Sequence, residues 1–115
     1  MQVLEAMDSI RQTLQSAGIR AETDPRNVNA PGAWIALQSI THNAQLCGSG
    51  TVRLSVYLIV PDAGIDQSTA NLALLLSSLL SVIDPDDDTT PTSVTLPGGG
   101  NGLPALRVTV DVATT

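Results

Sequence analysis

The sequence predicts a small α+β protein, a single domain in which helices pack on one antiparallel four-stranded sheet. Three observations predict it: an N-terminal segment with helical spacing of apolar residues, a Leu-rich segment without Gly or Pro, and four segments with strand character. A chain of 115 residues has the length of one domain. We therefore expect residues 1–115 to form one domain with the element order α-β-β-α-β-β.

The first helix is predicted over residues 2–17. Its apolar positions recur at spacings of four, three and four, which places them on one helical face: Val3, Met7, Ile10 and Leu14. Gly18 supplies a left-handed stop, and Ile19 is placed to fold back on the last turn. Residues 22–32 are rich in Asn, Pro and Gly and read as an irregular connection.

Two antiparallel hairpins are predicted. The first joins residues 33–40 to residues 51–60, where apolar side chains alternate with polar ones, and its tip is formed by Gly48, Ser49 and Gly50. The second joins residues 93–96 to residues 103–113 around a glycine-rich loop of Gly98, Gly99, Gly100, Asn101 and Gly102. We expect these two tips to be the loops that contact partner proteins.

The second helix is the most informative element. Asp66 is a candidate N-cap, and the pattern continues to Ile83, before Asp84 and Pro85. A helix that lies on a sheet needs an apolar stripe only about 100° wide. Here apolar residues surround most of the helix: Ala70, Leu72, Ala73, Leu74, Leu75, Leu76, Leu79, Leu80, Val82 and Ile83.

Something should cover this excess of apolar surface. The first helix can cover part of it, and the alternative is another subunit. Each exposed Leu that becomes buried contributes roughly 1.5 to 3 kcal/mol, so three or four of them could hold an oligomer together. The subunit interface expected on this reasoning consists of Leu72, Leu75, Leu76, Leu79, Leu80 and Ile83.

Composition argues against several classes of function. The net charge is −6 with five Arg and no Lys, whereas nucleic-acid binding depends on clustered cations. The one cysteine, Cys47, cannot form an internal disulfide. Residues 1–10 have no basic flank before an apolar run, and the apolar stretch within residues 70–83 is shorter than the ~20 residues that span a bilayer. We expect a soluble protein that does not enter a membrane.

No set of residues indicates catalysis or metal binding. Asp84, Asp86 and Asp88 have the one-three-five spacing of a calcium loop, but Thr89 and Thr95 stand where Gly and Glu are needed. The acidic run, with Asp87, is therefore interpreted as a solvated loop. A nucleophile pair of Cys47 and His42 lacks an orienting third group. The glycine-rich loop lacks the Lys-Ser/Thr pair of a phosphate site. We expect no enzyme, no cofactor and no metal.

Several segments together resemble the tail terminator proteins of siphophages. They are the N-terminal amphipathic helix, the stretch Asp24-Pro-Arg-Asn-Val-Asn-Ala-Pro-Gly-Ala-Trp-Ile35, the hairpin strand that ends Val56-Tyr-Leu-Ile-Val-Pro61, and the Leu-rich helix after Asp66. The likeness covers most of the chain. It lies in element order and short phrases rather than in a catalytic signature.

The resemblance implies a structural virion protein that forms a homohexameric ring at the head-proximal end of the tail tube. Such a ring ends tube polymerisation and joins the tail tube protein to the head-tail connector, and DNA passes through it without sequence-specific binding. Assembly would take place in the host bacterial cytoplasm. Two alternatives stay open: another neck or tail-completion protein, and a monomeric binding module with an apolar pocket between the Leu-rich helix and the sheet.

Overall fold

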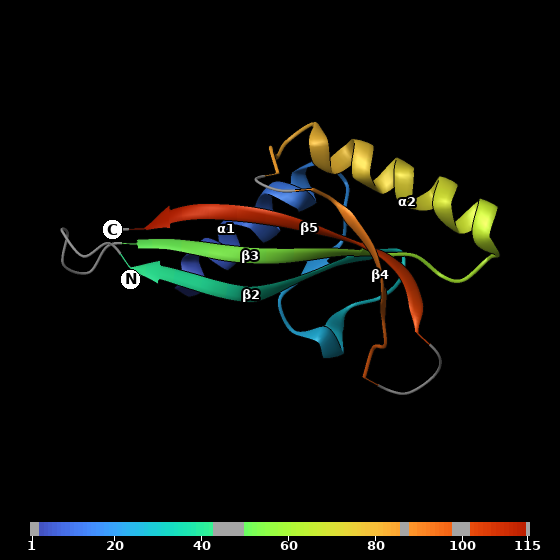
Figure 1. Ribbon diagram of the computed structural model, residues 1–115, viewed down its shortest axis with the longest axis horizontal. Helices are drawn as coiled ribbons and strands as arrows, with labels where there is room; N and C mark the ends of the chain where they lie inside the picture. The colour runs from blue at the N-terminus through green and yellow to red at the C-terminus, as the bar shows by residue number, and fades with distance from the viewer. Residues whose placement is uncertain (1–2, 43–49, 86–87, 98–101, 115) are drawn as a thin grey trace.

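The computed structural model, in which residues 3–42, 50–85, 88–97 and 102–114 are described, is a single-domain α+β fold with both α-helices on one face of a five-stranded sheet (Figure 1). The elements in chain order are α1 (Val3–Ser16), β1 (Ala21–Glu22), the 3-10 helix η1 (Pro25–Asn27), β2 (Gly32–His42), β3 (Gly50–Ile59), α2 (Ile65–Leu80), β4 (Thr90–Val94) and β5 (Leu103–Thr114).

The sheet corrects the expectation of four antiparallel strands. Its order is β1-β2-β3-β5-β4, and the extra strand β1 pairs parallel with β2, Ala21 opposite Ala33 and Glu22 opposite Trp34. The N–H of Ala33 also donates to the carbonyl of Arg20 at 2.7 Å. A strand of two residues is too short to show an alternating pattern, so periodicity could not predict it.

Both predicted hairpins are confirmed as antiparallel strand pairs. In the first, β2 and β3 pair from Gly32 opposite Ile59 to His42 opposite Gly50, with one register shift between Leu37 and Ser39. In the second, β4 pairs with the first half of β5. Strand β5 also pairs with β3 from Ala105 to Thr114, so β3 is the central strand of the sheet.

The stop after α1 is confirmed in its details. Gly18 has a φ of 83°, a conformation that side-chain-bearing residues rarely adopt. The N–H of Ile19 then donates to the carbonyl of Leu14 at 3.0 Å, and Ile19 is buried. Of the predicted stripe, Ile10 and Leu14 lie in the core, and Val3 and Met7 pack against it.

The limits of α2 differ from the prediction. Its N-cap is Gly64, with a φ of 88°, and Asp66 lies in the first turn instead. Gly64 suits this position because its φ is one that side-chain-bearing residues rarely adopt, and just before it the N–H of Ala63 donates to Oγ of Ser68 at 3.0 Å. The helix ends at Leu80 rather than Ile83, since the chain turns there and directs Ile83 into the core.

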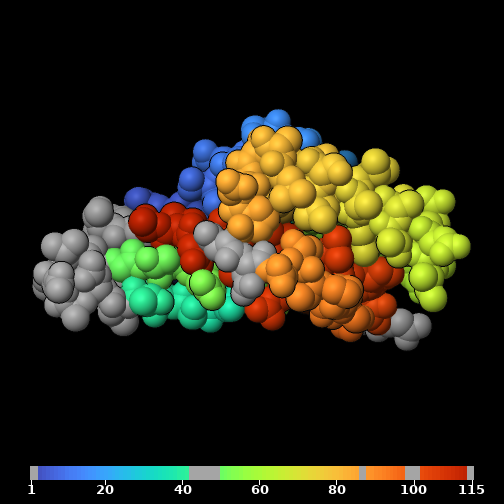
Figure 2. Space-filling model, turned by 45° about the horizontal axis from the view of Figure 1, so that its top comes forward, coloured from blue at the N-terminus to red at the C-terminus, as the bar shows by residue number. Residues whose placement is uncertain are grey.

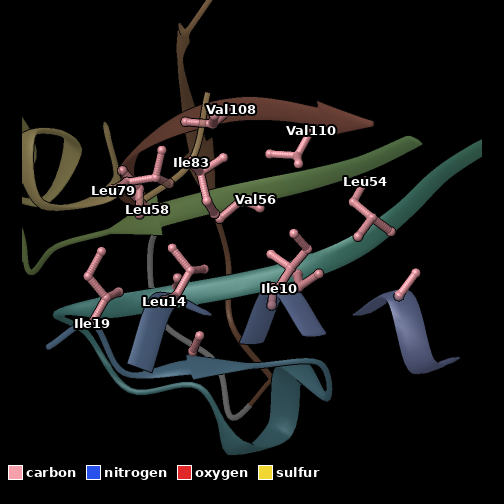
Figure 3. Close-up of a cluster of buried hydrophobic side chains, with 14 of the residues drawn as sticks. Ile10, Leu14, Ile19, Leu54, Val56, Leu58, Leu79, Ile83, Val108 and Val110 are labelled. Carbon is pink, nitrogen blue, oxygen red and sulfur yellow. The ribbon is translucent and has the colours of Figure 1, made fainter. Parts of the chain in front are cut away.

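The core is aliphatic, as the shortage of aromatic residues predicts. Side chains from α1, α2, β3 and β5 meet between the helices and the sheet (Figure 3), the labelled ones being Ile10, Leu14, Ile19, Leu54, Val56, Leu58, Leu79, Ile83, Val108 and Val110. A smaller cluster of Val28, Ile59, Val94 and Ala105 lies apart from this core. Trp34 and Tyr57 pack against it and stack with ring centroids 5.1 Å apart.

Removal of the Leu14 side chain should strongly destabilise the fold. Leu14 has no exposed surface, so Leu14→Ala leaves a cavity and should lower the free energy of unfolding by about 2–5 kcal/mol in urea denaturation. Leu4→Ala on the same helix is the matched control, because Leu4 is 81% exposed and its loss should change stability by under about 0.5 kcal/mol. Equal effects of the two substitutions would contradict the packing described above.

Candidate interaction surface on α2

Only part of α2 is seated on the sheet. Ile65, Leu72 and Leu79 follow one another at seven-residue intervals and share a helical face. Leu79 is fully buried and Leu72 is 7% exposed, but Ile65 is 86% exposed. Figure 1 shows the reason: the N-terminal end of α2 reaches past the end of the sheet. The burial of this face therefore decreases toward the start of the helix.

A groove lies on each side of α2. The larger has a volume of about 450 Å³ and lies between the helix and the residues just before β2 and just after β3. Its lining consists of Pro31, Val60, Pro61, Asn71, Leu74, Leu75 and Ser78. The smaller, of about 210 Å³, lies between the N-terminal half of the helix and the β4–β5 hairpin, with Ile65, Leu72, Pro91 and Pro104 among its lining residues. The helix is thus flanked on both sides by incompletely filled, largely apolar space.

The outward side of α2 carries exposed apolar residues and, from Gln67 onward, no charged residue. Leu74 is 69% exposed and Leu80 is 51% exposed, and Val82 just after the helix is also exposed. No charged residue occurs between Gln67 and Ile83. A helix that faces water usually carries charged residues on its outer side, as α1 does with Glu5, Asp8 and Arg11. Figure 2 shows α2, in yellow to gold, across one broad side of the molecule.

The structure divides the six residues predicted for a subunit interface. Leu72, Leu79 and Ile83 are buried within the protomer's own core, and Leu75 and Leu76 are partly buried against it. Leu80 is exposed. Sequence reasoning missed Leu74 and the prolines of the larger groove, because an all-apolar helix does not reveal which of its sides faces the sheet.

Most residues of the two predicted contact loops lie outside the described residues, namely Gly48, Ser49 and residues 98–101. Gly50 is the first residue of β3, and Gly102 immediately precedes β5. A Cβ at Gly102 would meet the hydroxyl of Ser93, which would have to rotate away to make room. The pairing of β4 with β5 ends next to this residue, at Val94 opposite Leu103.

The chemistry-bearing residues of the sequence do not form a site in the described part of the chain. His42 ends β2 with its side chain outside the described residues, and Cys47 lies outside them as well. Asp84 and Asp88 are exposed, and Asp86 and Asp87 are outside. Among described residues, no group of three or more His, Cys, Asp or Glu is close enough to hold a metal ion.

The opposite face of the sheet carries a polar network. The Arg53 guanidinium donates to both carboxylate oxygens of Asp111, at 2.8 and 3.0 Å, from the neighbouring strand. These hydrogen bonds hold the pKa of Asp111 below its ordinary value. Beside them the hydroxyl of Ser55 donates to the side-chain oxygen of Gln38 at 2.8 Å. This part of the face is therefore polar, whereas Trp34, Tyr57 and the smaller apolar cluster occupy another part of it.

Comparisons with known proteins leave the chain without a family assignment. No protein-family model matches it, and no curated protein matches it either. Within the described ranges, neither α-helix is both long and apolar enough to cross a bilayer. Functional inference therefore depends on the sequence pattern and on the surface of α2.

The ion pair predicts an acid-dependent loss of stability. A carboxyl group whose pKa is lowered by folding stabilises the native state above its unfolded pKa, and that contribution disappears as the pH falls through the folded pKa. Asp111→Asn should cost about 0.2–1 kcal/mol at pH 7, because the pair is partly exposed to solvent. Urea denaturation at pH values from about 7 down to about 2 should show a shallower acid loss in the variant than in the parent chain.

Arg53→Gln provides the matched comparison for this prediction. It removes the donor instead of the acceptor, so its stability should also fall less steeply with acid than that of the parent chain. Stability curves of parent and both variants that run parallel through the acid range would show that the pair makes no pH-dependent contribution.

Proposed function

We infer that the chain is a structural subunit that binds further copies of itself through the exposed side of α2. The observation that carries this inference is the uncharged outer surface of the helix, on which Leu74 and Leu80 are exposed and two grooves remain incompletely filled. Surface of this kind on a small domain typically marks a protein interface. Oligomers of one chain most often bury such a patch in a closed, symmetric assembly.

Burial of the exposed apolar side chains of α2 would favour association. Full burial of one exposed Leu contributes roughly 1.5–3 kcal/mol, and Leu74 and Leu80 are both more than half exposed. Leu75 and Leu76 are partly buried and would gain further contacts. Because no charged side chain between Gln67 and Ile83 must be desolvated, little electrostatic cost opposes contact along most of the helix.

The more specific proposal is a tail terminator of a siphophage. It is supported by the resemblance in the segments 24–35 and 56–61 and in the Leu-rich helix, all of which belong to one α+β domain. In this role the chain forms a ring, proposed to be a homohexamer, at the head-proximal end of the tail tube. It ends tube polymerisation and joins the tail tube protein to the head-tail connector within the virion. Another neck or tail-completion role would use the same self-association.

The acidic composition suits a ring that surrounds DNA. A net charge of −6 without Lys gives little attraction for phosphates, so DNA would pass through the ring without being held. Arg53, on the polar sheet face, is paired with Asp111 and so carries little free positive charge.

The larger groove favours a second candidate function, a monomeric binding module for an apolar ligand. Its lining is mostly Pro, Val and Leu, and its volume of about 450 Å³ falls in the usual range of ligand pockets. A thermal shift screen with apolar ligands distinguishes the two functions. The binding module would be favoured if an apolar ligand stabilised the monomer and if Leu75→Ser abolished that stabilisation.

Polar substitutions on the outer side of α2 should weaken self-association. Leu74→Ser and Leu80→Ser should each raise the dissociation constant of the assembly roughly tenfold or more, because each removes an apolar side chain from the interface. Light scattering after size-exclusion chromatography measures the assembled mass, with and without a siphophage tail tube protein present.

Leu4→Ser is the control for these variants, since Leu4 is equally apolar and more exposed but lies on α1. It should leave assembly unchanged. Far-UV circular dichroism should show the same helix content in all variants. A parent chain that stays monomeric at every concentration, both alone and with the tube protein, would exclude the proposed assembly.

A further inference from the structure

Within the described residues, one end of the sheet is three strands wide. β1 accompanies β2 only at Ala33 and Trp34, and β4 accompanies β5 only as far as Arg107. Beyond those points β2, β3 and β5 continue alone to the end of the sheet (Figure 1). The last three sets of register partners across β2, β3 and β5 are called rows, and together they form the open end of the sheet. The rows are Ile40/Val52/Val112, Thr41/Thr51/Ala113 and His42/Gly50/Thr114.

In the described part of the chain, β2 and β5 each pair with β3 on one side at the open end. On their other sides they have no neighbouring strand there. The side chains of Thr41 and Ala113 are exposed, and those of Ile40 and Val112 are partly exposed. Val52, between Ile40 and Val112, is fully buried. Two sheet edges at the same level, one on each side of the molecule, therefore present backbone groups for further pairing.

We propose that β5 of one subunit pairs at the open end with β2 of the next copy, so that the three-stranded parts of neighbouring subunits join into one sheet. This inference rests on the proposed self-assembly and adds a second contact to the one made by α2. β2 and β5 are each antiparallel to β3 and hence parallel to each other. A neighbour related by rotation about an axis close to the strand direction keeps that direction, so the new pair is parallel and the contact is head-to-tail.

The side chains of the two edges suit each other. In the row Ile40/Val52/Val112, joining would place Ile40 of the neighbour beside Val112, so an apolar row would continue across the contact on the helix-covered face. On the other face, Thr41 of the neighbour would meet Ala113. No like charges are opposed, because residues 39–42 include no Asp, Glu, Lys or Arg.

The edges also lack most of the features that keep edge strands apart. Lys and Pro residues commonly prevent edge-to-edge pairing, and neither occurs in residues 39–42 or 111–114. The irregularity in β2 lies between Leu37 and Ser39, before the open end, and the rows from Ile40 onward are regular. A second copy is the fitting occupant because it brings the complementary edge at the same level with the same apolar and polar faces.

Disulfide trapping tests this contact. In a Cys47→Ser background, Thr41→Cys combined with Ala113→Cys places one thiol on each edge in the same row. Within one subunit these positions are two strands apart, about 10 Å, beyond the Cα separation of about 4.4–6.8 Å that a disulfide spans. Mild oxidation of the assembled protein should therefore give a ladder of dimers and higher multimers on denaturing gels. Ser39→Cys with Ala113→Cys covers a register shifted by two residues.

The matched control is Thr41→Cys with Val112→Cys, in which the two side chains point to opposite faces of the sheet. It should give several-fold less cross-linked product than the best of the test pairs. Each single-Cys variant should give no dimer, since a head-to-tail contact never brings two identical edges together. Dimers from a single variant would overturn the proposal in favour of a two-fold contact.

The outcomes separate this proposal from the proposed function. If the protein assembles to full mass but neither test pair gives more cross-linked product than the control, the strand pairing is overturned. Assembly through α2 is then left intact. Pairing of these edges with an extended segment of a different protein would likewise leave the ladder absent. A chain that never assembles, with or without the tube protein, overturns both.

Discussion

The central strand β3 has four side chains with no exposed surface: Val52, Leu54, Val56 and Leu58. The neighbouring strands and the helices are arranged so that these side chains stay covered. β2 and β5 pair on either side of β3, so its hydrogen bonds are satisfied within the sheet. The apolar face that results needs a cover, and α1 and α2 supply it (Figure 3). Because the covering side chains are aliphatic, many modest contacts replace the few large ones that aromatic residues would make.

The same constraint explains why α2 retains apolar surface. The sheet requires one stripe of the helix, which Leu72 and Leu79 provide, and Ile83 continues the cover just beyond the helix end. The stripe stops short of Ile65, since the helix extends past the sheet, and Leu74 and Leu80 point elsewhere. Much of their surface stays exposed in the protomer. Their presence in a helix without charged residues after Asp66 is the physical basis for proposing a subunit that is completed by its neighbours.

The two proposed contacts use different forces. The α2 surface offers apolar area, which favours association without fixing direction. The open end of the sheet offers backbone hydrogen bonds, which fix strand direction and register but contribute modestly in net free energy. A ring needs both affinity and a defined angle between subunits, so the combination would suit a closed assembly better than either contact alone.

Local sequence patterns predict most of the elements. The four-three-four spacing up to Leu14, the stop at Gly18 and the alternation along β3 and β5 each depend on local periodicity or on one backbone conformation, which neighbouring residues encode. Packing in three dimensions sets which side of α2 faces the sheet, where that helix begins, and the pairing of β1 with β2. Those outcomes depend on contacts between residues distant in sequence, such as Ala33 with Arg20 and Leu79 with β3, and no local pattern records them.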